Sequence, residues 1–394
     1  MFCLLLSCLL VATYLNLTMN EKYNTSSFHY SFCFITIFFT ILIAIFIVIE
    51  SSIINTNHIA IAQQQPEQQQ VNTAESNNQT LSLTKQQTSP FIEDGSFDLD
   101  NVTFSHHMAS VNGIQMHYVI GGKGDPIVLL HGWPQTWYAW RHIMPDLAKN
   151  YTVIVPDLRG LGDSSKPFTG YDGKTTAEDI YQLVSQLGFK QIFLIGHDIG
   201  AQTAYSYAAI HPKNVSKLVV MELTFPGYMP PPSLGSTGLW WISFHQTPDI
   251  PEILVQGKER EYLTWFYRGL AYNPSAITQA DIDEFVSHYS APGGMRAGFE
   301  YYKAFPQNAK DNIELAATAK LTMPVLVLSG DIYPVLGGDI PGSMTLNSIQ
   351  SLALAANVQG VIVPYSGHWI PEERPDFLLD QLSKFFGNSN NDSK

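Results

Sequence analysis

An aspartate stands at the centre of residues 196–200 (GHDIG), between an apolar run and a helix-compatible stretch. This order of strand, glycine-flanked turn and helix is typical of a sharp turn that exposes one reactive side chain. A carboxylate at the apex can attack a saturated carbon that carries a strained or good leaving group, forming an ester on the enzyme. The pattern therefore predicts Asp198 as a nucleophile, and it excludes a serine esterase because no serine occupies the apex.

Two further segments could complete this site. Residues 131–134 (HGWP) follow a short apolar run, where a backbone N–H can join the N–H after the nucleophile in an oxyanion hole. We assign these two N–H groups to Trp133 and Ile199. His368 follows the last apolar run of the chain and is predicted as the general base that activates water.

The imidazolium that forms on such a base needs an acidic partner. Glu222 ends the apolar run at 217–221, and Asp331 follows the run at 324–328. Both positions are expected at carboxyl ends of strands, where side chains of a parallel sheet meet. The spacing alone leaves both carboxylates as candidates.

Apolar runs and amphipathic segments alternate from about residue 102 onward, which is typical of a mostly parallel sheet covered by helices on both faces. The predicted strands are 116–120, 127–130, 152–155, 191–195, 217–221, 324–328 and 360–363. The predicted helices are 137–149, 176–187, 200–210, 344–356 and 374–386.

This alternation is interrupted by an aromatic-rich interval at 225–319, in which 259–270 and 278–289 are predicted as helices. A helical insertion above the strand ends would form a cap over a pocket. The sequence therefore predicts an α/β core in two parts, 101–224 and 320–394 with a short tail, and a helical cap between them.

The first hundred residues differ from the rest. Residues 1–50 are predicted as a hydrophobic signal or anchor region, because 31–49 form an uncharged apolar stretch long enough to span a bilayer; either Met1 or Met19 could be the start. Residues 51–100 are rich in Gln, Asn and Ser and are predicted as a disordered linker. We therefore expect a membrane-anchored or secreted protein with an extracytoplasmic catalytic domain.

Composition excludes several classes of function. The 394-residue chain has a formal net charge of −13 and no Lys/Arg cluster, which argues against nucleic-acid binding. All three cysteines lie before residue 34, so the catalytic region holds neither a disulfide framework nor a cysteine zinc site. The chemistry expected of Asp198 needs no metal and no cofactor.

The chain resembles the epoxide hydrolases of the α/β-hydrolase family, and the related haloacetate and haloalkane dehalogenases, in segments 131–134, 157–167 (DLRGLGDSSKP), 196–200 and 367–369 (GHW). The resemblance implies an α/β-hydrolase fold and hydrolysis of an epoxide to a vicinal diol. It favours Glu222 as the acidic partner of the base, with Asp331 second.

The resemblance also implies cap residues that protonate the epoxide oxygen. The family's tyrosine donor maps to Tyr302 in the segment Tyr301-Tyr302-Lys303. A second donor position falls on Trp241, whose indole N–H can only donate a hydrogen bond, and His245 is expected to substitute. We expect Trp241 and His245 in the substrate pocket.

Two alternatives remain. Hydrolytic dehalogenation of a haloalkane or haloacid would use the same Asp198, but Ile199 stands where haloalkane dehalogenases usually carry Trp and haloacetate dehalogenases carry Arg. A non-catalytic binding protein would need no water-activating base. The expected partner is therefore a small apolar epoxide, with a halogenated substrate as the alternative.

Overall fold

The computed structural model of the protein describes residues 95–228, 239–319, 321–331 and 357–387. Nine strands within these residues form one sheet, in the order β1-β2-β3-β5-β4-β6-β7-β8-β9. Their bounds are β1 Ser96–Leu99, β2 Val102–Val111, β3 Ile114–Gly122, β4 Asp125–Leu130, β5 Tyr151–Pro156, β6 Ile192–His197, β7 Val215–Met221, β8 Val325–Gly330 and β9 Val358–Val363.

The sheet is mostly parallel. Strands β5, β4, β6, β7, β8 and β9 run in one direction, and β1, β2, β3 and β5 pair antiparallel in succession. The central strands β4, β6 and β8 are almost wholly buried, as expected for strands covered on both faces. The predicted fold class is confirmed, and each predicted strand is present.

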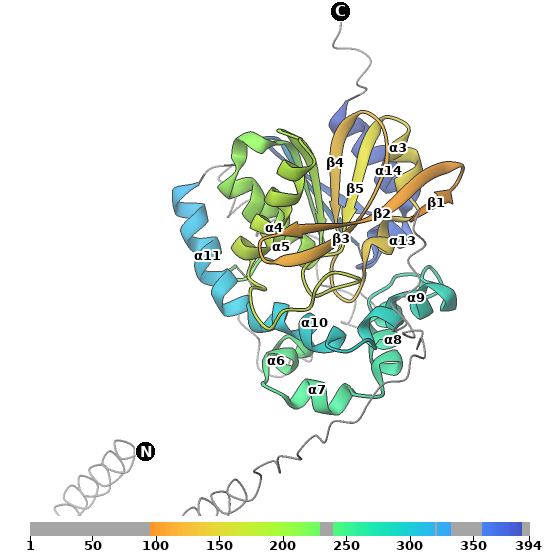
Figure 1. Cartoon of the computed structure of the whole chain (residues 1–394), viewed down its shortest axis with the longest axis vertical. Coiled ribbons are helices and arrows are strands. Elements are labelled where there is room, and N and C mark those ends of the chain that lie inside the picture. The colour runs from red at the N-terminus through yellow and green to blue at the C-terminus, as the bar shows by residue number, and fades with distance from the viewer. Residues whose placement is uncertain (1–94, 229–238, 320, 332–356, 388–394) are drawn as a thin grey trace, which may run out of the picture. The chain divides into compact units, whose positions relative to one another are not determined.

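Helices cover both faces of this sheet. Figure 1 shows α4 and α5 on one face and α3 and α14 on the other. The segment predicted as one helix over 137–149 is divided into two, because Pro145 fits only in the first turn of a helix. The bounds are η1 Trp137–Trp140, α3 Met144–Ala148, α4 Gly173–Gln186, α5 Ile199–Ile210, η2 Pro212–Asn214, α13 Ile370–Glu373 and α14 Pro375–Phe386.

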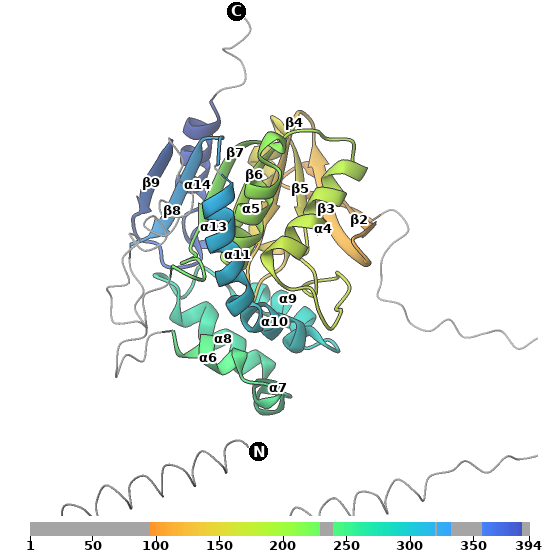
Figure 2. The same ribbon diagram turned by 90° about the vertical axis from the view of Figure 1, so that its left-hand side faces the viewer.

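Within the interval predicted as a cap, 225–319, the described residues 239–319 are mostly helical. Helices α6 to α10 gather at one end of the sheet in both Figure 1 and Figure 2, whereas α11 packs against α4 and α5 on the face of the core. The bounds are α6 Trp240–Gln246, α7 Ile250–Val255, α8 Glu259–Gly269, α9 Gln279–Tyr289, α10 Gly294–Lys303 and α11 Phe305–Thr318.

The helices that the structure describes are shorter than a bilayer is thick. The longest described helices, α4 and α11, have 14 residues each. At a rise of about 1.5 Å per residue they span about 21 Å, short of the roughly 30 Å hydrocarbon core of a bilayer. No helix among the described residues could cross a membrane, and segment 31–49 lies outside them.

The predicted linker extends too far toward the core. Strand β1 lies inside the range 51–100 that the sequence predicts as linker, and it pairs antiparallel with β2. Residues 1–94 and the predicted helix 344–356 lie outside the described residues.

Candidate active site

Asp198 occupies the sharp turn between β6 and α5, with φ 53° and ψ −128°. Such a backbone conformation costs a non-glycine residue about 1–3 kcal/mol. A Cβ on Gly196 would overlap the carbonyl oxygen of Gly200, and one on Gly200 would overlap that of His131. Only glycine fits at these two positions, so the close approach of strand and helix holds Asp198 at the carboxyl end of the sheet.

The carboxylate of Asp198 lies against the segment that follows β4. The backbone N–H of Trp133 donates to its Oδ1 at 2.9 Å. The backbone N–H of Ile199 also bonds to this carboxylate. Both N–H groups that the sequence predicts as an oxyanion hole are therefore directed at Asp198.

His368 lies between two carboxylates. Its Nε2 is 3.7 Å from Oδ2 of Asp198, and its Nδ1 is 3.3 Å from Oε2 of Glu222. Glu222 directly follows β7, and its other oxygen, Oε1, accepts the N–H of Gly330 at 2.5 Å. The structure thus brings Asp198, His368 and Glu222 into one line of contacts, with all three side chains largely buried.

This arrangement shifts the proton affinities of the site. Burial lowers the pKa of His368, but the hydrogen bond to Glu222 and the charges of Asp198 and Glu222 outweigh it, so the pKa is raised. Burial raises the pKa of Asp198, against the opposing charge of His368 and the N–H groups of Ile199 and Trp133. An imidazole with a raised pKa is a stronger base, which suits removal of a proton from water.

Asp331, the other candidate acid, makes different contacts. Its carboxylate accepts the N–H of Tyr365 at 2.9 Å and that of Ser366 at 3.3 Å. These bonds anchor the loop that precedes His368. Glu222, in contrast, contacts the imidazole itself.

His197 is a site residue to which the sequence analysis assigned no role. Its ring is buried, and burial with the nearby His368 holds its pKa well below the ordinary value. The neutral ring donates its Nε2–H to the carbonyl oxygen of His368 at 2.8 Å. Its position directly before the nucleophile was the signal that could have identified it.

Helix α10 places a phenol beside Trp133, whose backbone N–H bonds to Asp198. Tyr302, on α10, packs its ring perpendicular to the indole of Trp133, with 5.4 Å between ring centroids. Burial raises the pKa of Tyr302 well above its ordinary value, and the charge of Asp198 adds to this shift. The phenol therefore keeps its proton at neutral pH and can act as a donor.

A second cap residue, His245 on α6, lies beside Tyr302, with 4.4 Å between ring centroids. Its Nε2 is 2.6 Å from the hydroxyl of Tyr262 on α8. Burial lowers the pKa of His245 to about 3, so the ring is neutral. Sequence reasoning missed Tyr262, because an aromatic residue on an aromatic-rich helix has no feature that separates a polar contact from packing.

Trp241, expected in the substrate pocket, is buried within the cap. Its ring contacts Trp240 and Trp265 at centroid distances of 6.1 and 6.2 Å and Phe266 at 5.6 Å. His245 also packs against Phe266 and, in addition, against Trp133 of the core. Of the two expected pocket residues, His245 is the one that contacts the oxyanion segment.

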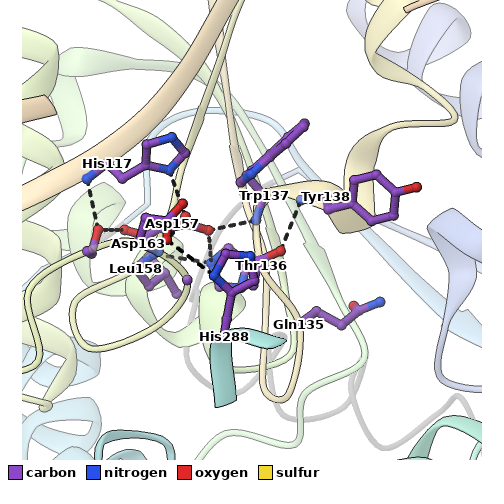
Figure 3. Close-up of polar contacts among 12 residues, drawn as sticks. His117, Gln135, Thr136, Trp137, Tyr138, Asp157, Leu158, Asp163 and His288 are labelled. Carbon is purple, nitrogen blue, oxygen red and sulfur yellow. Dashed lines mark hydrogen bonds and ion pairs between the residues drawn. The ribbon is translucent and has the colours of Figure 1, made fainter. Parts of the chain in front are cut away.

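A buried network around Asp157 supports the oxyanion segment (Figure 3). Oδ2 of Asp157 accepts from Nδ1 of His117 at 2.7 Å, and Oδ1 accepts from the N–H of Trp137 at 2.8 Å. Burial raises the pKa of Asp157, but the hydrogen bond and charge of His117 outweigh it and leave the pKa below its ordinary value. The ionised carboxylate therefore fixes the start of η1, three residues after Pro134.

His288 connects the cap to this network (Figure 3). Its Nδ1 lies 3.3 Å from Oδ1 of Asp163, and its Nε2 lies 3.3 Å from Oε1 of Glu284. Burial lowers the pKa of His288, but hydrogen bonds to these two carboxylates raise it to about 10. A protonated imidazole on α9 thus holds the cap to the loop after β5.

One cluster among the described residues has the composition of a metal site. The ligand atoms of His117, Asp157 and Asp163 lie within 4.8 Å of one another. Both oxygens of Asp157 are already hydrogen-bonded, since Oδ2 also accepts the N–H of Asp163 at 3.1 Å and Oδ1 that of Trp137. The contacts of Asp157 are therefore those of a structural hydrogen-bond network.

Comparisons with known proteins identify the family of the chain. The α/β hydrolase fold family matches residues 125–375. A soluble epoxide hydrolase of Corynebacterium sp. strain C12 is 40% identical over 289 residues, which cover 72% of this chain and 97% of the relative. The solved structure of Cfl2 from Burkholderia cenocepacia is 39% identical with a TM-score of 0.67, covering 72% of this chain and 96% of that one. The epoxide hydrolase CorEH is 38% identical with a TM-score of 0.64, covering 72% and 98%.

The expected localisation is corrected by the same comparisons. The apolar segment 31–49 predicts a membrane-anchored or secreted protein with an extracytoplasmic catalytic domain, whereas the relative at 40% identity is named a soluble enzyme. An apolar stretch in the sequence is by itself a weak indicator of location, because its length fits an anchor whether or not it serves as one. The chain belongs to the α/β-hydrolase fold family and is a hydrolase related to the epoxide hydrolases.

Proposed function

We propose that this protein hydrolyses an epoxide to a vicinal diol through a covalent ester on Asp198. One observation carries the proposal: the Asp198 carboxylate has the His368–Glu222 pair on one side and lies within electrostatic reach of the buried phenol of Tyr302. A carboxylate nucleophile, a water-activating base and a proton donor are the three groups that this reaction needs. Relatives named epoxide hydrolases support the substrate class.

In the first step, one oxygen of Asp198 attacks an epoxide carbon. Oδ1 is held by the N–H of Trp133, so Oδ2 is the oxygen placed to attack. The carbon–oxygen bond of the epoxide breaks while Tyr302 donates its proton to the departing oxygen. A hydroxyalkyl ester and a tyrosinate result.

In the second step, His368 removes a proton from water, and the water oxygen attacks Cγ of Asp198. The N–H groups of Trp133 and Ile199 hold the oxyanion on Oδ1. The bond between Cγ and Oδ2 then breaks, so the diol carries away an oxygen of the enzyme. One proton of the water goes to the leaving alcohol, through His368. The other restores the hydroxyl of Tyr302, which closes the cycle.

Glu222 orients the His368 ring and stabilises the imidazolium. His245 and Trp241 are proposed to line the substrate pocket, with His245 as the second polar group beside Tyr302. A neutral histidine suits this role, because it offers one N–H to the epoxide oxygen without adding a charge. Hydrolytic dehalogenation through the same Asp198 is the competing reaction.

A parallel screen tests the proposed reaction. Styrene-type epoxides, aliphatic epoxides, haloalkanes and fluoroacetate are assayed with diol and halide release measured separately. We expect diol formation from at least one epoxide class, with halide release at background, because the cap offers a phenol for an alkoxide. Halide release that outpaces diol formation would instead assign a dehalogenase.

Replacing Tyr302 with phenylalanine removes the proposed proton donor. We expect epoxide turnover to fall by roughly 10²–10⁴-fold, the usual contribution of general acid catalysis. The matched control is Tyr301→Phe, since the neighbouring Tyr301 hydroxyl donates to the carbonyl of Arg159 at 2.8 Å. That control should lose about 1 kcal/mol of stability and little activity. If Tyr302→Phe keeps turnover close to the wild-type rate, the donor is another group.

A further inference from the structure

The loop that carries His368 is bonded directly to the cap. The backbone N–H of His368 donates to the carbonyl oxygen of Leu270 at 2.9 Å, in the connection between α8 and α9. A Cβ on Gly367 would overlap that same oxygen. The proposed general base is therefore in backbone contact with Leu270, the residue that directly follows α8.

Glu373, the last residue of α13, bridges these two segments. Its Oε1 accepts the N–H of Gly367 at 2.9 Å and that of Trp369 at 3.3 Å. Its Oε2 accepts the N–H of Asn273, in the cap connection, at 2.8 Å. One carboxylate thus binds the residues on both sides of His368 and ties them to the cap.

The charge of Glu373 also acts on the imidazole. It contributes to raising the pKa of His368, together with Asp198 and Glu222. Burial raises the pKa of Glu373 itself, and its backbone N–H partners oppose that shift. Asp331 anchors the same loop from the core, through Tyr365 and Ser366.

We propose that Glu373 is a positioning residue for the proposed reaction: it couples the cap to His368 and thereby supports hydrolysis of the ester intermediate. The inference rests on the proposed function. Formation of the ester uses Asp198, Trp133 and Tyr302, whereas Glu373 holds the backbone around His368. Only the second step requires the imidazole as a base, so only that step should depend on Glu373.

The variant Glu373→Gln tests this coupling. A glutamine keeps the size of the side chain but has one acceptor oxygen, so either the His368 loop or the cap connection loses its bond. In single-turnover quench experiments on an epoxide that the wild-type enzyme turns over, we expect ester formation to stay within about twofold. Ester hydrolysis should fall by roughly 10–100-fold, the effect of a small misplacement of a catalytic group.

A pH profile supplies a readout that a purely structural role would not move. The base acts when it is neutral, so ester hydrolysis falls as the pH drops through the pKa of His368. Loss of a nearby negative charge lowers this pKa, and the acid limb should therefore shift to lower pH in Glu373→Gln. Glu373→Asp keeps the charge with a shorter reach, so its acid limb should stay near that of the wild type while hydrolysis is slowed.

The matched control is Asp376→Asn, which removes an exposed carboxylate three residues further along the chain. We expect it to leave the rates of ester formation and ester hydrolysis, and the acid limb of the pH profile, unchanged. Equal slowing of both steps in Glu373→Gln, or wild-type hydrolysis with an unshifted limb, would overturn the proposal for Glu373. Failure of the wild-type enzyme to form any ester would overturn the proposed function instead, so the two failures are distinguishable.

Discussion

Asp198→Ala is expected to lower kcat by at least about 10⁴-fold, because the variant lacks the group that forms the covalent intermediate. The fold should survive this change. Burial raises the pKa of Asp198, so its ionised form is held at a cost in the folded protein. At neutral pH the alanine variant should therefore unfold at the same or a higher temperature than the wild type, which thermal denaturation measures.

Labelled water checks the same residue in the wild-type enzyme. In a single turnover with heavy-oxygen water, the ester route transfers an enzyme oxygen to the diol and leaves the label on Asp198. Peptide mass analysis should find the label there before it appears in product. Immediate labelling of the diol, or residual activity of Asp198→Ala above about 1% of wild type, would show that water attacks the epoxide directly.

His368→Gln is expected to form the ester and then stall. Removing the base leaves Asp198, Trp133 and Tyr302 in place, so attack on the epoxide continues. Water activation is lost, and ester hydrolysis should slow by about 10²–10⁴-fold. Intact-protein mass spectrometry should therefore show an adduct equal to the mass of the substrate.

Two carboxylate variants serve as the comparison for His368→Gln. Glu222→Gln removes the charge that contacts Nδ1 of the imidazole at 3.3 Å and should also accumulate the ester, to a smaller extent. Asp331→Asn alters the anchor of residues 365–366 and should affect hydrolysis less than Glu222→Gln. If no adduct forms in His368→Gln with any substrate that the wild type consumes, the covalent mechanism is wrong.

Most of the α/β core could be predicted from the sequence, because its strands are buried on both faces and read as continuous apolar runs. Strand β1, at one edge of the sheet, and its neighbour β2 were not predicted. Both strands are only partly buried, and polar residues interrupt their apolar ones. Such strands are stabilised by pairing with a neighbour, which a local pattern does not report.

The site was predictable to the extent that it depends on local geometry. The glycines around Asp198 identify the turn, since strand and helix approach too closely for a Cβ. The segment after β4 and the loop after β9 follow from their positions behind apolar runs. The roles of these residues in catalysis stay predictions until the variants are measured.

The class of fold and the positions of Asp198, Trp133 and His368 could be predicted from the sequence alone, because each of these residues closely follows an apolar run that forms a strand of the sheet. Three contacts, in contrast, emerge from the folded structure: Glu222 rather than Asp331 contacts the imidazole, Tyr262 binds His245, and Glu373 joins the His368 loop to the cap. Each of these contacts links segments far apart in the chain. Their distances depend on how strands and cap helices pack, and no local pattern of residues encodes that.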